Sequence, residues 1–173
     1  NEAITEFKYL DQELIIDATS TSKTLRFQYN KDNKSIIKNV TFHPDSYSID
    51  HEYLMKGSWD SNINLVWQDG LQPTENSLGI KKFHPDVIDA VGASIKPLNE
   101  GKETLRITGS SDNFELTNQA IDWAAIQTKY FIVALIPDSN ARPSQAKISG
   151  KSIDFNDHHE GYVQSYDMNL TYQ

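Results

Sequence analysis

The chain has 173 residues, of which 38% are hydrophobic and 10% aromatic, and this composition is typical of one globular domain with its own core. Its formal net charge of -8 argues against nucleic acid, which is bound through lysine and arginine at the phosphates, and against broad adsorption on anionic lipid. The absence of cysteine excludes a disulfide framework and a thiolate metal site.

The first residues, NEAITEF, contain no initiating methionine, no basic stretch and no apolar signal segment. We therefore expect residues 1–173 to be a single domain excised from a longer protein.

Apolar and polar residues alternate through the first part of the chain, as a strand buried on one face requires. The alternation predicts strands over 24–29, 36–42 and 47–55, with polar turns at 31–34 and 43–45. These three strands form a predicted meander. A further strand is predicted over 62–68, after the turn KGSWDS.

The middle of the chain has weaker signals. A long polar loop is expected over 69–79, one helical turn over 84–91, and a short strand over 104–109. The segment from Gln119 to Thr128 is interpreted as a helical turn, because Ala120, Ile121, Ala124, Ala125 and Thr128 recur at helical spacing.

The run from Tyr130 to Ile136 has seven consecutive apolar or aromatic residues and stops at Pro137. Since a helix needs about 20 apolar residues to span a bilayer, this run is not a membrane span, and we interpret it as a fully buried strand. A long strand is predicted over 162–172. Many short strands and only a few short helical turns predict an all-β fold, an antiparallel sandwich.

The sequence favours no catalytic site, no metal and no cofactor. The stretch DHHE at 157–160 suggests a metal site, but adjacent residues of an extended segment point to opposite faces. His51 is a candidate general base, although a hydrogen-bonded histidine at the rim of a core is the commoner case. Trp67 and Trp123 lie in apolar patterns and are expected in the core, whereas Trp59 lies in a polar turn and is expected to be exposed.

The stretch DWAAIQTKYFIVALIP, 122–137, resembles the signature of the large periplasmic domain of the YidC-type membrane protein insertases. The order of residues carries the resemblance: a tryptophan, small or apolar residues, a glutamine, then Tyr-Phe, a small-apolar run and Ile-Pro. The matching positions are Trp123, Gln127, Tyr130, Phe131, Ala134, Ile136 and Pro137. The segments 22–55 and 110–123 and the ending GYVQSYDMNLTYQ are similar to the family in order and pattern, whereas 69–103 matches nothing in it.

The resemblance implies a β-supersandwich, of galactose mutarotase-like architecture, at the periplasmic face of the bacterial inner membrane. It implies a non-catalytic platform that contacts Sec accessory subunits or nascent membrane proteins, without inserting into the membrane itself. The signature residues are then mainly structural, with Trp123 and Phe131 buried. Partner contact is expected at exposed edges and loops, with four candidate residues: Trp59, Asp69, Gln72 and Glu75.

A mutarotase-like or carbohydrate-binding sandwich remains the alternative, since a fold does not fix a function. Such an enzyme needs a general base and acid, typically a histidine and a carboxylate that face each other. The sequence pairs none of its five histidines with a carboxylate.

Overall fold

The computed structural model describes residues 7–10, 19–59, 62–71, 91–107, 109–154 and 162–173. Every regular element in these ranges is a β-strand, and the strands pair antiparallel throughout. The chain forms two compact units, Asn1–Asp60 and Ser61–Gln173, which we describe separately. The all-β fold class is confirmed, whereas the single-domain organisation stays a prediction.

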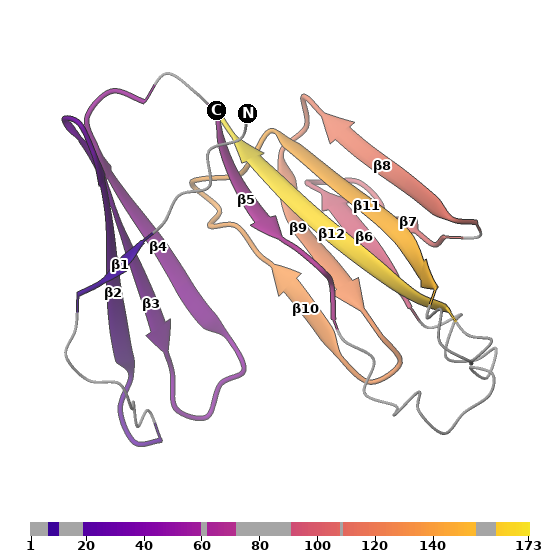
Figure 1. The fold of residues 1–173 in the computed structure, drawn as a ribbon, viewed down its shortest axis with the longest axis horizontal. Helices are drawn as coiled ribbons and strands as arrows, with labels where there is room; N and C mark the ends of the chain where they lie inside the picture. Colours follow the sequence, from indigo (N-terminus) through magenta and orange to yellow (C-terminus); the bar gives the residue numbers. More distant parts are fainter. Residues whose placement is uncertain (1–6, 11–18, 60–61, 72–90, 108, 155–161) are drawn as a thin grey trace. The chain divides into compact units, whose positions relative to one another are not determined.

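Unit 1 is one four-stranded sheet in the order β1-β2-β3-β4 (Figure 1). Its strands are β1 (Lys8–Tyr9), β2 (Lys23–Lys31), β3 (Lys34–Phe42) and β4 (Ile49–Lys56). β2 and β3 are joined by a tight turn at which Asp32 has a φ of 52°, a left-handed conformation that aspartate tolerates better than most residues. The predicted meander and its polar turn are therefore confirmed.

Unit 2 consists of two four-stranded sheets, in the orders β10-β9-β6-β7 and β5-β12-β11-β8. The first contains β6 (Gly92–Pro97), β7 (Glu103–Leu105), β9 (Ile121–Gln127) and β10 (Ile132–Leu135). The second contains β5 (Ile63–Trp67), β8 (Ser111–Thr117), β11 (Gln145–Asp154) and β12 (Tyr162–Tyr172). β12 and β11 of one sheet pack against β9 and β6 of the other, which makes unit 2 an antiparallel sandwich (Figure 1).

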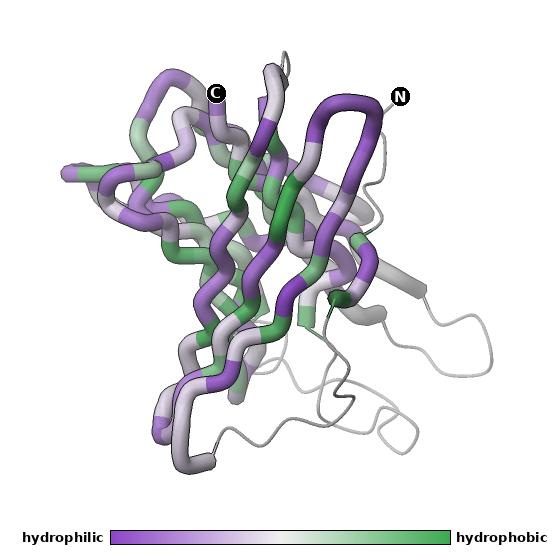
Figure 2. Tube along the Cα trace, turned by 90° about the vertical axis from the view of Figure 1, so that its left-hand side faces the viewer, coloured by the Kyte–Doolittle hydropathy of each residue, from purple (hydrophilic) through white to green (hydrophobic). Residues whose placement is uncertain are grey.

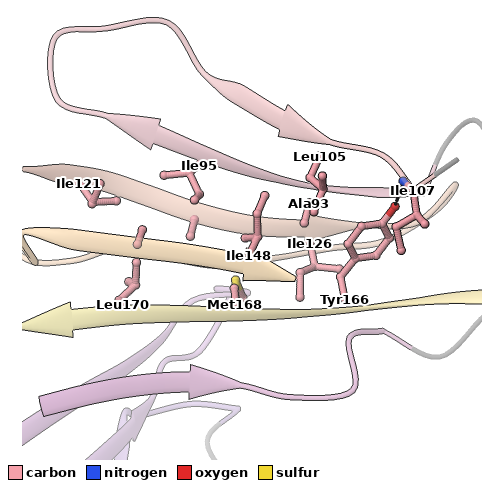
Figure 3. Packing of buried hydrophobic residues seen from close by; sticks show 12 residues of the cluster. Ala93, Ile95, Leu105, Ile107, Ile121, Ile126, Ile148, Tyr166, Met168 and Leu170 are labelled. Atoms are coloured by element: carbon pink, nitrogen blue, oxygen red, sulfur yellow. Dashed lines mark hydrogen bonds between the residues drawn. The ribbon is translucent and has the colours of Figure 1, made fainter. Parts of the chain in front are cut away.

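The core of unit 2 lies between its two sheets (Figure 3). Alternate residues of β12 point inward, and Tyr166, Met168 and Leu170 are fully buried, as the period-two pattern over 162–172 predicts. The Tyr166 hydroxyl accepts a hydrogen bond from the backbone N–H of Ile107 at 3.1 Å and donates one to Gln164 Oε1 at 3.1 Å. This buried phenol fixes the chain just after β7, where the short predicted strand is only three residues long.

The predicted helical turn over 119–128 is wrong, because residues 121–127 form the central strand β9. A β-bulge explains the spacing that suggested a helix. Lys96 pairs with Trp123 and Pro97 with Ile121, so that Asp122 has no opposite residue on β6. The extra residue places Ile121 and Ala124 on the same inner face, three positions apart, as in a helix.

The prediction of a fully buried strand over 130–136 is half right. Residues 132–135 form β10, whose Val133 and Leu135 pack on the core. The rest of the run is exposed: the exposed fractions are 58% for Tyr130, 55% for Phe131, 64% for Ile132 and 75% for Ile136. The physical reason is position, because β10 is an outer strand of its sheet and covers the core with one face only.

The predicted helical turn at 84–91 and most of the predicted loop at 69–79 lie outside the described residues. Among those the structure does describe, there is no helix of the length and hydrophobicity that crossing a membrane requires.

Candidate partner-docking surfaces

One face of the unit 1 sheet is apolar and largely aromatic. The strand register aligns Leu25 with Val40, Tyr9 with Phe27, and Ile36 with Met55 on this side. We call it the aromatic face, and its apolar members are Tyr9, Leu25, Phe27, Tyr29, Ile36, Val40, Phe42, Ile49, Tyr53 and Met55. The alternation that produces it is visible along the strands in Figure 2.

The aromatic face is poorly covered. Only Val40 among its members is buried, whereas Ile49, Tyr53 and Met55 on β4 are 47%, 38% and 41% exposed. The rings of Tyr9 and Phe27 stack with centroids 5.2 Å apart, in a tilted arrangement. A contiguous apolar surface left open in this way is typical of an interaction site.

The charged groups on the aromatic face are all basic. The same strand register places four lysines on this side, namely Lys23, Lys31, Lys34 and Lys38. The strand carboxylates Asp50 and Glu52 lie on the opposite face, where Glu52 accepts a hydrogen bond from Asn39 at 2.7 Å. The face is thus locally positive in a chain whose net charge is -8.

Lys38 lies at the centre of the aromatic face, with its ammonium group 5.6 Å from the centroid of the Tyr53 ring. Burial lowers the pKa of Lys38, because the neighbouring rings remove water from the charged form. The pKa of the adjacent His51 is also lowered, first by desolvation and then by the charge of Lys38, while Asp50 opposes both effects. An incoming carboxylate would stabilise the charged form of Lys38.

The outer edge of β10 is a second exposed surface, in unit 2. A turn leads into it, in which the Thr128 N–H donates to the carbonyl of Phe131 at 2.7 Å and the Phe131 N–H donates to Thr128 Oγ1 at 3.2 Å. Lys129 and Tyr130 form the tip, with the lysine ammonium 5.2 Å from the ring centroid. The tip and edge therefore combine exposed aromatic and aliphatic side chains.

The structure spreads the signature residues over one hairpin. Trp123 and Gln127 are half-buried on β9, Tyr130 and Phe131 are exposed at the turn, and Pro137 follows β10. The expectation that Phe131 is buried is wrong, because the residue lies at the turn beside an outer strand. Trp123 is only partly covered, so it is not the core residue that its apolar surroundings suggested.

Of the four predicted contact residues, the two that the structure describes, Trp59 and Asp69, are held by hydrogen bonds within unit 1 and unit 2 respectively. Trp59 is half-buried, donates its indole N–H to the Lys56 carbonyl at 3.1 Å and lies under the ammonium of Lys34. Asp69 is exposed, but its N–H donates to Asp167 Oδ1 at 2.7 Å, which fixes the loop onto β12. Gln72 and Glu75 lie outside the described residues, so contact there stays a prediction.

The structure contains a histidine–carboxylate pair that sequence reasoning missed. His43 Nε2 lies 2.8 Å from Asp50 Oδ2, and His43 Nδ1 lies 3.0 Å from Ser22 Oγ. The Asp50 side chain is 69% exposed, so the pair lies in water, where such pairs contribute little and lack the enclosed environment of a catalytic base. His51, the candidate general base, lies opposite Val40 on the aromatic face, and the positive charge of Lys38 contributes to lowering its pKa.

Metal binding finds no support in the described part of the chain, where no three histidine or carboxylate residues gather in a way that could hold an ion. The stretch 157–160, the strongest sequence candidate, is not among those residues.

Comparison with known proteins matches residues 3–171 to the family described as the YidC periplasmic domain. Two curated relatives carry the name membrane protein insertase YidC. The protein from Maridesulfovibrio salexigens is 26% identical over 127 residues, which is 72% of this chain and 22% of the relative. The protein from Saccharophagus degradans is 24% identical over 139 residues, 78% of this chain and again 22% of the relative. The chain thus spans about a fifth of the length of these relatives.

Proposed function

Because the chain belongs to the YidC periplasmic domain family, we propose that it is a non-catalytic docking domain of a membrane protein insertase. It acts at the periplasmic face of the bacterial inner membrane, as part of an integral membrane protein. Its partners are proteins, either Sec accessory subunits or nascent membrane proteins. The remainder of the insertase performs the insertion itself.

The aromatic face is the observation that carries this proposal. Its exposed tyrosine and methionine side chains are of the types enriched at protein interfaces, because they supply large contact areas. Its lysines, and the absence of strand carboxylates from this side of the sheet, favour a partner that presents apolar side chains together with carboxylates. Docking of this kind needs no general base, and Asp50 of the histidine–carboxylate pair lies on the opposite face of the sheet.

Weak intrinsic affinity is sufficient for this role. When both partners are held in one membrane, binding becomes effectively intramolecular, and the effective concentration reaches about the millimolar range for short tethers. We therefore expect the docked complex to be short-lived once the domain is separated from the membrane.

Two adjacent positions on β4 allow a matched test. Tyr53 lies on the aromatic face and Leu54 on the opposite face, and both are exposed, at 38% and 46%. A photo-crosslinking amino acid is placed at one position or the other in the full-length insertase in cells. Cross-links to a Sec accessory subunit or to a nascent membrane protein are expected from position 53 and not from position 54.

The Lys38→Glu variant adds a test of the charge argument. It should weaken the cross-link from position 53, whereas the Lys56→Glu change on the opposite face should leave it unaltered. Equal cross-linking from positions 53 and 54, or none from position 53 in a folded protein, would contradict the proposal.

A further inference from the structure

In the described part of unit 2, the hydrogen-bonding pattern leaves alternate backbone groups of β10 without a partner strand along its outer edge. Thr128 and Phe131 form a hydrogen-bonded pair, so the next such pairs across the ladder are Ile126 with Val133 and Ala124 with Leu135. The N–H and C=O groups of Ile132 and Ala134 therefore point away from β9. Within the described residues, no other strand pairs with β10 on that side.

The side chains at the same positions are exposed as well. Ile132 and Ile136 are 64% and 75% exposed, and Ala134 between them is also exposed, whereas Val133 and Leu135 face the core. The edge thus presents a row of backbone donors and acceptors beside a row of uncovered apolar side chains. A strand paired with β10 would form hydrogen bonds with the outward backbone groups and would cover the exposed apolar side chains.

β10 is short, which is one protection of an edge, but it lacks three others. Charged residues, prolines and bulges discourage pairing with another chain, and β10 contains none of them. Two of the other outer strands of unit 2 carry charges, Glu103 on β7 and Asp112 and Glu115 on β8, whereas β5 carries no charge but has the polar Asn64. Among the described outer strands of unit 2, β10 alone consists only of apolar residues.

We propose that the outer edge of β10 binds an extended, uncharged segment of another polypeptide by strand addition. The absence of charge from Tyr130 to Pro137 sets the chemistry of the occupant, because a charged side chain placed beside Ile132 or Ile136 would lose water without gaining a partner. Valine, isoleucine and threonine suit the occupant, since they favour the extended conformation. An unfolded stretch of an apolar protein meets both conditions.

This inference goes beyond the docking function proposed above and does not depend on it, because it concerns unit 2 and the purified chain. The brevity of β10, four residues, means that binding is weak and selective for extended segments. Side chains of the occupant would alternate between the outer face of the sheet, beside Ile132 and Ile136, and the side of Val133 and Leu135.

Amide hydrogen exchange of the 173-residue chain tests the proposal residue by residue. The probe is a capped peptide of alternating valine and threonine, long enough to reach from Tyr130 to Pro137. In the free chain, the amides of Ile132 and Ala134 should exchange quickly and those of Val133 and Leu135 slowly. At saturating peptide, exchange at Ile132 and Ala134 should slow by about tenfold or more, while Val133 and Leu135 stay as they were.

The Ala134→Pro variant removes one outward donor and leaves the ladder with β9 intact, because proline is tolerated at the free side of an edge strand. It should lose the peptide-dependent protection, and the control Ala134→Val, which keeps the donor, should retain it. Continued slow exchange at Val133 and Leu135 shows that the proline variant is folded. A peptide methylated on two adjacent central amides should fail to protect the wild-type chain, because it lacks the backbone donors that strand pairing requires. This second control tests strand addition even if the proline variant unfolds.

Three results would overturn the inference. The first is the absence of protection by the unmethylated peptide, and the second is equal protection by the methylated one or in a folded Ala134→Pro chain. The third is protection of Ile132 and Ala134 in the free chain that rises with chain concentration, since a second copy would then occupy the edge.

Discussion

The core is tightly packed around Gly150, and substituting this residue with alanine should destabilise the sandwich. Gly150 lies in the middle of β11, opposite Tyr166 on β12 and Asp112 on β8. A Cβ atom at this position would lie 2.8 Å from Ile107 Cγ1 and 2.9 Å from Tyr166 Cδ1, and it would also overlap Ile107 Cδ1. Real Cβ atoms do not approach carbon so closely, so at least one of these buried side chains must move.

The expected loss in the free energy of unfolding depends on how far the Ile107 and Tyr166 side chains must move. Overpacking a well-packed core costs about 1–3 kcal/mol, and displacement of Tyr166 would also strain its hydrogen bond to the Ile107 amide. For a chain of this size each 1 kcal/mol lowers the melting temperature by roughly 2–4 °C. Chemical denaturation followed by circular dichroism measures the loss, with Gly101→Ala as the control, because a Cβ there meets nothing within 4 Å.

A second substitution tests the reasoning itself. Ile107→Val removes Cδ1, the atom nearest to the new methyl group, and by itself costs about 0.5–1.5 kcal/mol. Combined with Gly150→Ala it should recover part of the loss, so that the double variant is more stable than the sum of the two single changes predicts. Strict additivity, or a Gly150→Ala chain as stable as wild type, would refute the steric account.

Three further expectations concern single side chains. Phe131→Ala should cost less than about 1 kcal/mol because the ring is 55% exposed, whereas Ile126→Ala, at 1% exposure, should cost about 2–5 kcal/mol. Similar losses in denaturation would contradict the exposed position of Phe131 at the turn. Tyr166→Phe should cost about 1–3 kcal/mol, since it leaves the buried Ile107 amide without its acceptor, and an unchanged midpoint of unfolding would argue that water replaces the hydroxyl. The pKa of His51 lies below the usual 6.5, so the folded state favours the neutral ring, and stability is lost as pH falls below 6.5 until the folded pKa is passed. His51→Gln should flatten that loss, and an NMR titration placing the His51 pKa at or above 6.5 would contradict it.

Period-two alternation was sufficient to predict the strands that have one buried face and one open face. It located β3, β4 and β12 within a few residues, because each alternates between apolar and polar positions over its whole length. The same signal fails at β9, where the bulge at Asp122 shifts the phase by one residue and imitates a helix. A bulge is defined by the pairing with a partner strand, here β6, and the local sequence of β9 contains no information on that pairing.

The candidate surfaces were harder to predict than the strands. The run from Tyr130 to Ile136 looks buried because composition records hydrophobicity and not whether a strand is central or outermost. The basic character of the aromatic face could have been noticed, because Lys31, Lys34 and Lys38 share the phase of Tyr29, Ile36 and Val40 along the predicted hairpin. The His43–Asp50 pair depends on how β3 and β4 align across their turn, which no spacing rule gives.

The pairing of β5 with β12 has a consequence for the order of events as the chain folds. β5 lies at the start of unit 2, yet its only described partner is the last strand, with Leu65 opposite Leu170. The meander of unit 1 needs only neighbouring segments, so it can form as soon as residue 56 is available. The sandwich must wait for its final strand, because Tyr166, Met168 and Leu170 supply the middle of the core. Such distant pairings slow folding, and unit 2 is therefore the part that would remain open to chaperones or proteases while the chain emerges.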